Sequence, residues 1–500
     1  MASASDRRVR VWERLQQVPS YGISHVTVES SPVLAQQDVH FGQLTVVTGT
    51  HGVGKSYLLR SIAALLPRGY GFPMGPPFFS GDGSNKGVLN GKFTATYLDG
   101  QTLHPWTLDL GRANRDALPE APLSDLGEQA PWTRYVEPSL MFSEYSMLFQ
   151  GYDSNLESFP SRPLMPPSRP ELEYLRDVLG RRYETFEWRE INTEPSVDDG
   201  HYWVPHVEAT VDGRVITSAQ MSSGELWVHY VLWSLRTAGP EQIILIDEPE
   251  AFLSPAGHRP FLDEIARLTL ASKAQTIVAT HSAAMIDRTP ASMIRVLAPS
   301  TAGVQIVRPS SSISALRMLG QYPELAGIVL VEDDLARRIV QAMLSRSDNY
   351  LAQRVDIVDC GGKDKALATA RVMARSTRLA VCVVLDGDQR DANVDHTGLR
   401  IAYLPGDEPD NAILTSVRTA PGRLAERASL NADDVAMALD GLRFHPHQYW
   451  FSKLAESLGL SHEILVSHLI YLWFQDDAVN ADAMEIVRKI GEALVYSRRS

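Results

Sequence analysis

Short apolar segments alternate with longer segments of helical periodicity along most of the chain. In the first half, three segments are apolar and rich in β-branched residues, as expected for strands that are buried on both faces of a parallel sheet: 44–48, 243–246 and 276–279. A helical segment, 56–66, follows the first of them after a glycine-rich loop. The pattern predicts an α/β fold in which helices cover a mainly parallel sheet.

A second α/β set begins at 328–331, continues with a helical segment at 335–344, and returns to strands near 355 and at 380–385. It predicts a smaller parallel sheet. After roughly residue 440 the pattern is helical, with apolar faces marked by Leu454, Leu458, Leu465, Leu469 and Trp473. We expect this tail to serve in packing or dimerisation.

The length of 500 residues favours two or three packed units over one core. Prolines cluster at 67–77 and 160–170, which predicts loops around an inserted region. A helix is expected at 171–183, and a hairpin with an Asp-Gly turn at 206–217. We therefore predict three parts: 1–310 with an inserted lobe at about 70–200, then 325–435, and a helical segment at 440–500.

The composition is that of an ordinary globular protein, with 44% hydrophobic residues and 21% charged residues. A formal charge of -13 argues against coating nucleic acid by bulk charge, although a local basic groove remains compatible with it. The two cysteines, Cys360 and Cys382, predict neither a disulfide scaffold nor a zinc site. Without a long apolar segment, we expect no membrane partner and a cytoplasmic location.

The segment 49–56 fits the phosphate-loop pattern GxxxxGK[ST]. In this pattern backbone N–H groups surround phosphate, the lysine reaches the β and γ oxygens, and the hydroxyl residue holds Mg²⁺. The strand before it and the helix after it are the context that the motif requires. The candidate ligands of ATP and Mg²⁺ here are Gly49, Gly52, Gly54, Lys55 and Ser56.

The apolar segment 243–246 ends in two acids, Asp247 and Glu248. A strand that delivers an aspartate to the Mg²⁺ shell is the usual partner of a phosphate loop. The adjacent glutamate is placed to orient and deprotonate the attacking water. We predict that Asp247 is a metal ligand and that Glu248 is the catalytic base.

Ser222 and Glu225 have the spacing of a helix capping box. The segment 222–225 also resembles the ABC ATPase signature, which implies that Ser223 and Gly224 present a hydroxyl and a helix N-terminus to the γ-phosphate of an opposite subunit. The same resemblance implies that His281 senses the γ-phosphate and that Gln150 contacts Mg²⁺ and water. The alternatives are a cap alone, a structural histidine and a surface glutamine.

The order of these motifs, with Asp-Glu-Pro-Glu at 247–250 and Ala-Thr-His-Ser at 279–282, resembles the ABC-type heads of the SMC, RecF and OLD-like group over residues 20–310. This resemblance implies that ATP clamps two copies of the head together and that hydrolysis releases them. The expected partner is therefore the chain itself, as a dimer or a higher homo-oligomer.

Carboxylates also follow two strands of the second set. Asp386 and Asp388 share one side of their strand because they are at i and i+2. Together with Glu332, which ends an earlier strand, they predict a Mg²⁺ or Mn²⁺ site suited to phosphodiester cleavage. Asp407 or Glu408 could add a metal ligand, or both could be solvated loop acids.

The strand-end glutamate, the Gly361-Gly362 pair and the Asp-x-Asp motif resemble a TOPRIM domain over about 325–420. An ABC head followed by TOPRIM is the arrangement of the OLD (overcoming lysogenization defect-like) family of nucleases, which include Gabija-type antiphage endonucleases. The resemblance implies an ATP-regulated, metal-dependent endonuclease that acts on DNA in antiphage defence. One departure is that Asp333 and Asp334 follow Glu332 where the family usually has glycine.

Two other functions fit the sequence. The first is an ATPase sensor or scaffold whose TOPRIM-like part does not cleave and which controls a separate effector. The departure after Glu332 motivates this alternative. The second is a RecF-like DNA repair clamp that binds DNA through the head alone, which the second acidic site weighs against.

Overall fold

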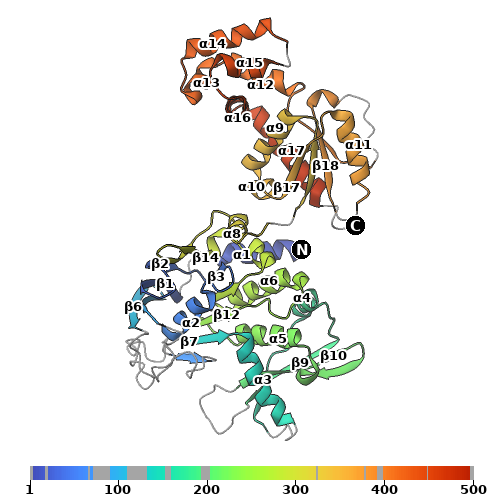
Figure 1. Cartoon of the computed structure of the whole chain (residues 1–500). Coiled ribbons are helices and arrows are strands. Elements are labelled where there is room, and N and C mark those ends of the chain that lie inside the picture. The colour runs from blue at the N-terminus through green and yellow to red at the C-terminus, as the bar shows by residue number, and fades with distance from the viewer. Residues whose placement is uncertain are drawn as a thin grey trace. The chain divides into compact units, whose positions relative to one another are not determined.

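The computed structural model describes the chain as two compact units, Met1–Tyr322 and Pro323–Ser500 (Figure 1). Each unit is considered by itself. No helix in the described part of the chain is both long and apolar enough to cross a membrane. The described residues are 4–16, 21–65, 68–70, 90–109, 132–152, 159–192, 203–322, 325–376, 379–390, 398–446 and 449–495.

The first unit is built on a seven-stranded sheet in the order β15-β14-β3-β13-β12-β7-β4. All neighbouring pairs are parallel except β14 and β15. The three predicted central strands lie side by side in it, and β3 and β13 are buried throughout. The strands are β3 (Leu44–Gly49), β4 (Arg68–Tyr70), β7 (Trp132–Val136), β12 (Gln242–Asp247), β13 (Gln275–Thr280), β14 (Ile294–Ser300) and β15 (Gly303–Val307).

Two antiparallel sheets accompany the central one, in the orders β2-β1-β5-β6 and β11-β10-β9-β8. The predicted hairpin is present, and Asp212 and Gly213 make its turn with positive φ angles. The strands are β1 (Tyr21–Ser30), β2 (Gln37–His40), β5 (Lys92–Asp99), β6 (Thr102–Asp109), β8 (Ser161–Pro163), β9 (Thr185–Asn192), β10 (Trp203–Val211) and β11 (Arg214–Thr217).

Alternate residues of the central strands face two different hydrophobic cores. Ile244 and Ile246 of β12 contribute to a core that contains residues of α5 and α6, whereas Ile243 and Leu245 contribute to one that contains residues of α2 and β5. The helices are α1 (Ala4–Leu15), α2 (Lys55–Leu65), α3 (Pro138–Tyr152), α4 (Arg169–Leu179), α5 (Ser223–Arg236), α6 (Pro255–Ser272), α7 (Ala283–Arg288) and α8 (Ser312–Met318).

Part of the region predicted as an inserted lobe belongs to the head sheets. β7 pairs with β12 in the central sheet, and β5 pairs with β1. Since β7 has only five residues and follows a long segment without a clear pattern, its place in the sheet was not visible in the sequence.

The second unit contains a parallel sheet in the order β17-β16-β18-β19. Helix α11 packs on one face, and α9 and α17 pack on the other (Figure 1). The strands are β16 (Gly327–Val331), β17 (Val355–Asp359), β18 (Val381–Leu385) and β19 (Ile401–Tyr403). The helices are α9 (Asp334–Ser347), α10 (Asn349–Ala352), α11 (Lys363–Met373), α12 (Pro409–Arg418), α13 (Pro421–Ala428), α14 (Ala432–Gly441), α15 (Trp450–Ser457), α16 (His462–Trp473) and α17 (Asp477–Val495).

The C-terminal helices share the core of this second unit. Ile490 and Leu494 of α17 belong to the same hydrophobic cluster as Val329 of β16. The fit is close, because a Cβ atom added at Gly327 would lie 2.5 Å from Leu494 Cδ2. Helix α17 therefore completes the layer that covers this sheet.

His229 of α5 makes the first unit sensitive to acid. Its ring is buried against Tyr183, Phe186 and Trp188, and its Nδ1 has no hydrogen-bond partner among the described residues. Burial lowers the pKa of His229 to about 4. The unfolded chain therefore takes up a proton at His229 more readily than the folded protein does. The neutral, buried ring contributes its full share to the free energy of unfolding above the unfolded pKa of 6.5, and this contribution is lost as the pH falls towards 4.

We expect His229→Gln to reduce this acid sensitivity, because glutamine does not titrate. Between pH 7 and pH 5 the wild-type protein should lose about 2 kcal/mol more unfolding free energy than the variant. Denaturant melts at the two pH values measure the difference. The same substitution at the partly exposed His104 of β6 is the control. An equal pH dependence in wild type and His229→Gln would contradict the prediction.

Candidate nucleotide and metal sites

The phosphate loop has the backbone that its glycines predict. Gly52 and Gly54 have φ angles of 73° and 108°, which side-chain-bearing residues rarely adopt. At Gly49, an added Cβ would lie 2.6 Å from Val53 Cγ1. The Lys55 ammonium folds back onto the loop, where it donates to the carbonyl oxygens of Gly49 at 3.0 Å and Thr50 at 3.1 Å. Backbone carbonyls thus hold the cation that is expected to bind phosphate.

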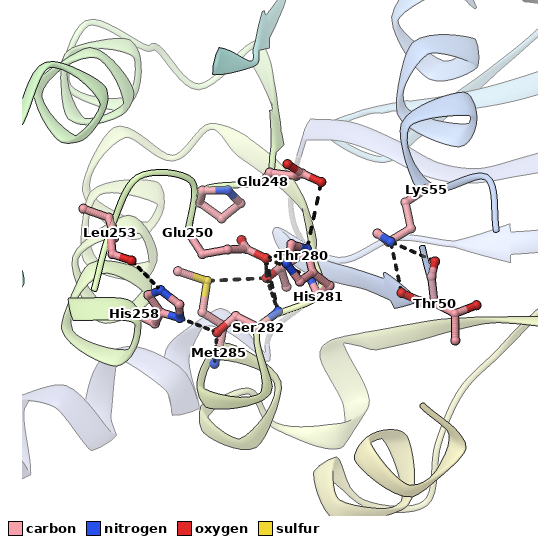
Figure 2. Close-up of polar contacts among 12 residues, drawn as sticks. Thr50, Lys55, Glu248, Glu250, Leu253, His258, Thr280, His281, Ser282 and Met285 are labelled. Atoms are coloured by element: carbon pink, nitrogen blue, oxygen red, sulfur yellow. Dashed lines mark hydrogen bonds and ion pairs between the residues drawn. The ribbon is translucent and has the colours of Figure 1, made fainter. Parts of the chain in front are cut away.

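The parallel strands bring the predicted ATP-site residues to one edge of the sheet. β3, β13 and β12 are consecutive in the sheet, so their carboxyl ends carry the phosphate loop, His281 and Asp247 respectively. Figure 2 shows Lys55, His281 and Glu248 around this edge. Burial lowers the pKa of Lys55, while the charges of Asp247, Glu248 and Glu250 raise it.

Asp247 has an oxygen available for a cation. Its carboxylate is buried, and burial raises its pKa, although Ser56 and Tyr135 lower it. Oδ2 accepts a hydrogen bond from the Tyr135 hydroxyl at 3.1 Å, whereas Oδ1 has no hydrogen-bond partner among the described residues. A buried carboxylate oxygen without a partner, close to a serine hydroxyl, is chemistry that fits Mg²⁺.

Tyr135 of β7 holds Asp247 in place, a role that the sequence did not reveal. Its hydroxyl also accepts a hydrogen bond from Arg60 Nε at 3.2 Å, and Arg60 pairs with Glu137 at 2.9 Å. Partners behind a metal ligand fix its orientation and its basicity. The signal in the sequence is weak, because Tyr135 follows the long segment without a clear pattern.

We expect Tyr135→Phe to raise the Mg²⁺ concentration needed for half-maximal ATP hydrolysis by about 10-fold. The substitution removes one hydroxyl and leaves the aromatic ring in the core. A Mg²⁺ titration of ATPase activity measures the effect. Tyr145→Phe, which removes another buried hydroxyl that binds the Pro205 carbonyl, is the matched control. If both variants need as much Mg²⁺ as wild type, Tyr135 does not orient Asp247.

Glu248 and His281 face each other across the site. Glu248 has a left-handed backbone with φ 53°, and its side chain is 45% exposed. Its Oε1 lies 3.9 Å from His281 Nδ1 (Figure 2). Two neighbours of His281 could not be predicted from the sequence. These are His51, whose ring centroid lies 4.6 Å away, and the buried Glu250, with Oε1 at 3.2 Å from Nδ1.

The capping box expected at the start of α5 is present. Ser222 N donates to Glu225 Oε2 at 3.0 Å, and Glu225 N donates to Ser222 Oγ at 3.3 Å. Ser223 is exposed, and Gly224 packs closely, since an added Cβ would lie 2.7 Å from the Phe252 carbonyl oxygen. The predicted Gln150 lies in α3, but its side chain is outside the described residues.

The second candidate site lies at the carboxyl edge of the smaller sheet. Glu332 follows β16, and its Oε1 accepts the backbone N–H of Asp386 at 3.0 Å. Asp388 N donates to the Asp407 carbonyl at 2.7 Å. Only glycine fits between the two aspartates, because a Cβ at Gly387 would lie 1.5 Å from the Gly406 carbonyl oxygen.

The negative charges of this site are poorly balanced. Burial, together with the charges of Glu332, Asp333, Asp388 and Asp410, raises the pKa of Asp386 to about 7. Burial also raises the pKa of Glu332, which Lys363 lowers. This donor set suits a hard divalent cation. Among the described residues, however, no three His, Cys, Asp or Glu side chains are grouped closely enough to hold a metal ion.

The acids that depart from the TOPRIM pattern have structural roles. Asp333 caps α9 by accepting from Ala336 N at 2.8 Å. Asp334 pairs with Arg337 and Arg338. The candidate Glu408 lines a groove of about 640 Å³ together with Asp388 and Asp407.

Lys363 is linked to this site through Gln389. Its Nζ donates to Gln389 Oε1, and Gln389 Nε2 donates to Asp388 Oδ2 at 2.8 Å. The chain of hydrogen bonds places one positive charge at the acidic edge of the sheet.

A comparison with known protein families found a match within the first unit. Residues 206–287 match the family described as "AAA domain, putative AbiEii toxin, Type IV TA system". The matched region contains Ser223, Asp247, Glu248 and His281, but not the phosphate loop. No curated protein is significantly similar to the chain.

Several solved structures are distantly similar. The SMC head domain from Thermotoga maritima is 14% identical, with 57% of this chain and 98% of that chain covered, at a TM-score of 0.32. The C-terminal region of the Burkholderia pseudomallei OLD protein is 14% identical, with 35% and 98% covered, at a TM-score of 0.22. At these TM-scores the likeness carries no implication for the function of this chain.

The family match and the phosphate-loop geometry agree with each other. The matched residues supply the strand-end acids and the histidine, and the phosphate loop lies on a neighbouring strand of the same sheet. The first unit therefore combines a phosphate loop with a segment that is similar to an AAA-type ATPase domain.

Proposed function

We propose that this chain hydrolyses ATP with Mg²⁺, that two ATP-loaded copies pair through their heads, and that pairing regulates a Mg²⁺- or Mn²⁺-dependent DNA endonuclease site in the second unit. The observation that carries the proposal is the presence of two parallel sheets, each with functional side chains at its carboxyl edge. One edge carries the ATP-site residues, and the other carries Glu332, Asp386 and Asp388.

At the first edge, Lys55 and the loop N–H groups bind the phosphates, and Ser56 and Asp247 hold Mg²⁺. The metal supplies charge neutralisation on the β and γ oxygens. The exposed Glu248 orients the attacking water and accepts its proton, and His281 contacts the γ-phosphate. Asp247 Oδ1, which has no hydrogen-bond partner in the described part of the chain, supports this assignment.

Pairing of heads is supported by the exposed start of α5. Its capping box leaves the Ser223 hydroxyl in solvent beside a helix N-terminus, where a partner's γ-phosphate could be bound. On this proposal each ATP site is completed by a second copy of the chain.

The nuclease assignment rests on the donor set at the second edge. Glu332, Asp386 and Asp388 would hold one or two divalent cations, which supply a hydroxide nucleophile and stabilise the leaving oxygen. Lys363 would neutralise a phosphate. The DNA substrate and a role in antiphage defence are inferred from the resemblance of this domain order to the OLD family.

One observation favours the sensor or scaffold alternative. The carboxylates of the second site are not arranged around an ion, and Asp333 and Asp334 are engaged in α9. A chain that binds metal poorly would use ATP to control a separate effector.

Cleavage of a supercoiled plasmid by the purified protein, with Mg²⁺ or Mn²⁺ and with or without ATP, tests the nuclease. Light scattering with and without ATP tests pairing. Metal-dependent nicking together with ATP-dependent doubling of mass supports the proposal. ATP hydrolysis without nicking in any condition favours the sensor, and an unchanged mass with ATP contradicts head pairing.

A further inference from the structure

Glu250 is buried beneath the predicted γ-phosphate histidine. It follows Asp247, Glu248 and Pro249. Glu248 and Phe252, which lie two positions before and two positions after it, have φ angles of 53° and 63°. Such angles are unfavourable for residues with side chains and persist where contacts enforce them. This loop turns the Glu250 side chain inward, where it is 5% exposed.

One oxygen of Glu250 organises the loop that carries His281. Oε1 accepts from Thr280 Oγ1 at 2.7 Å, from His281 N at 2.8 Å and from Ser282 N at 3.1 Å (Figure 2). Three donors to a single buried oxygen fix the backbone of residues 280–282 against the loop after β12. A second link has His258 between Ser282 Oγ at 2.8 Å and the Leu253 carbonyl at 3.3 Å.

The contact between Glu250 and the His281 ring is incomplete. His281 Nδ1 lies 3.2 Å from Glu250 Oε1, yet neither Nδ1 nor Glu250 Oε2 has a hydrogen-bond partner among the described residues. Buried polar atoms without partners are unfavourable, and the His281 ring lies close enough to the Glu250 carboxylate to pair with it. When both ring nitrogens carry protons, Nδ1 can donate to the Glu250 carboxylate, and Nε2, on the opposite side of the ring, can donate to a γ-phosphate oxygen.

We propose that Glu250 is the positioning residue for His281: it binds Nδ1 when ATP is present, and so aims Nε2 at the γ-phosphate. This inference rests on ATP hydrolysis at the proposed site. On this inference, Glu250 makes the site selective for nucleotides that carry a γ-phosphate, because ADP has no γ-phosphate for His281 to contact.

The test compares Glu250→Gln with wild type in the full chain. Glutamine keeps the size of the side chain and an oxygen for the backbone donors, but it removes the carboxylate that faces Nδ1. We expect kcat for ATP to fall about 10- to 100-fold. Affinity for adenylyl imidodiphosphate, a non-hydrolysable ATP analogue, should fall, while ADP affinity and melting temperature stay unchanged. Glu264→Gln, at a buried carboxylate of α6 paired with Arg267, is the matched control with wild-type kcat.

A double mutant shows whether Glu250 acts through His281 or supports the site independently of it. In a His281→Ala background, Glu250→Gln should change kcat by no more than about twofold, because its target is gone. Additive losses, an equal loss of ADP affinity, or wild-type behaviour of Glu250→Gln would overturn the inference. Should Glu250→Gln not fold, Glu250→Asp, which shortens the side chain, is judged by the same measurements. If wild type itself fails to hydrolyse ATP, the proposed function fails, and this result is distinct from all the others.

Discussion

Lys55→Ala is expected to reduce ATP hydrolysis about 1,000-fold, because it removes the one cation of the phosphate loop. Nζ is already held at the loop by two carbonyl oxygens, and phosphate oxygens would replace these acceptors when ATP binds. Burial has lowered the pKa of Lys55, so an anionic ligand stabilises its charged form. Phosphate release and binding of a fluorescent ATP analogue measure the two effects.

Lys92→Ala is the matched control for this variant. Lys92 lies on β5 and pairs with Glu29 at the surface, so its removal should leave hydrolysis unchanged. Normal turnover by a folded Lys55→Ala protein would show that ATP is hydrolysed elsewhere or by a contaminant.

The sequence was most informative where burial is extreme. β12 and β13 are continuously apolar because both faces of the central sheet are covered, so their pattern can be recognised without neighbours. The phosphate loop was equally clear, since Gly52 and Gly54 adopt backbone angles that few other residues tolerate.

Contacts between distant residues were not visible in the sequence. Glu250 acts on Thr280 and His281, thirty residues away, and only the parallel pairing of β12 with β13 brings them together. Tyr135 reaches Asp247 in the same way through β7. Each looks like an ordinary polar residue in its own segment, because its role depends on strand order.

The contacts of Asp333 and Asp334 in α9 explain why two aspartates follow Glu332 in place of the usual glycine. Asp333 serves as an N-cap and Asp334 as an ion-pair partner in the first turn of α9, which are common uses of aspartate at a helix start. The sequence therefore identified the acidic edge through Glu332 and Asp386, whereas the contacts assign the two following acids to α9.

Asp386→Asn is expected to abolish metal-dependent plasmid cleavage, by about 1,000-fold or the equivalent of about 4 kcal/mol, while ATP hydrolysis remains at the wild-type rate. The amide keeps the shape of the side chain and its backbone N–H bond to Glu332, but it removes one negative charge from the donor set. The two activities separate because Asp386 and the ATP site belong to different units.

The control for this experiment is Asp434→Asn, at an exposed acid in the first turn of α14, which should cleave like wild type. The melting temperature of Asp386→Asn adds a second readout. Removing a carboxylate that is buried among four other acids should leave stability unchanged or raise it. Loss of cleavage in a protein of unchanged or higher stability identifies a metal ligand. Loss of both cleavage and ATP hydrolysis would instead show that the second unit supports the head, and would contradict separate sites.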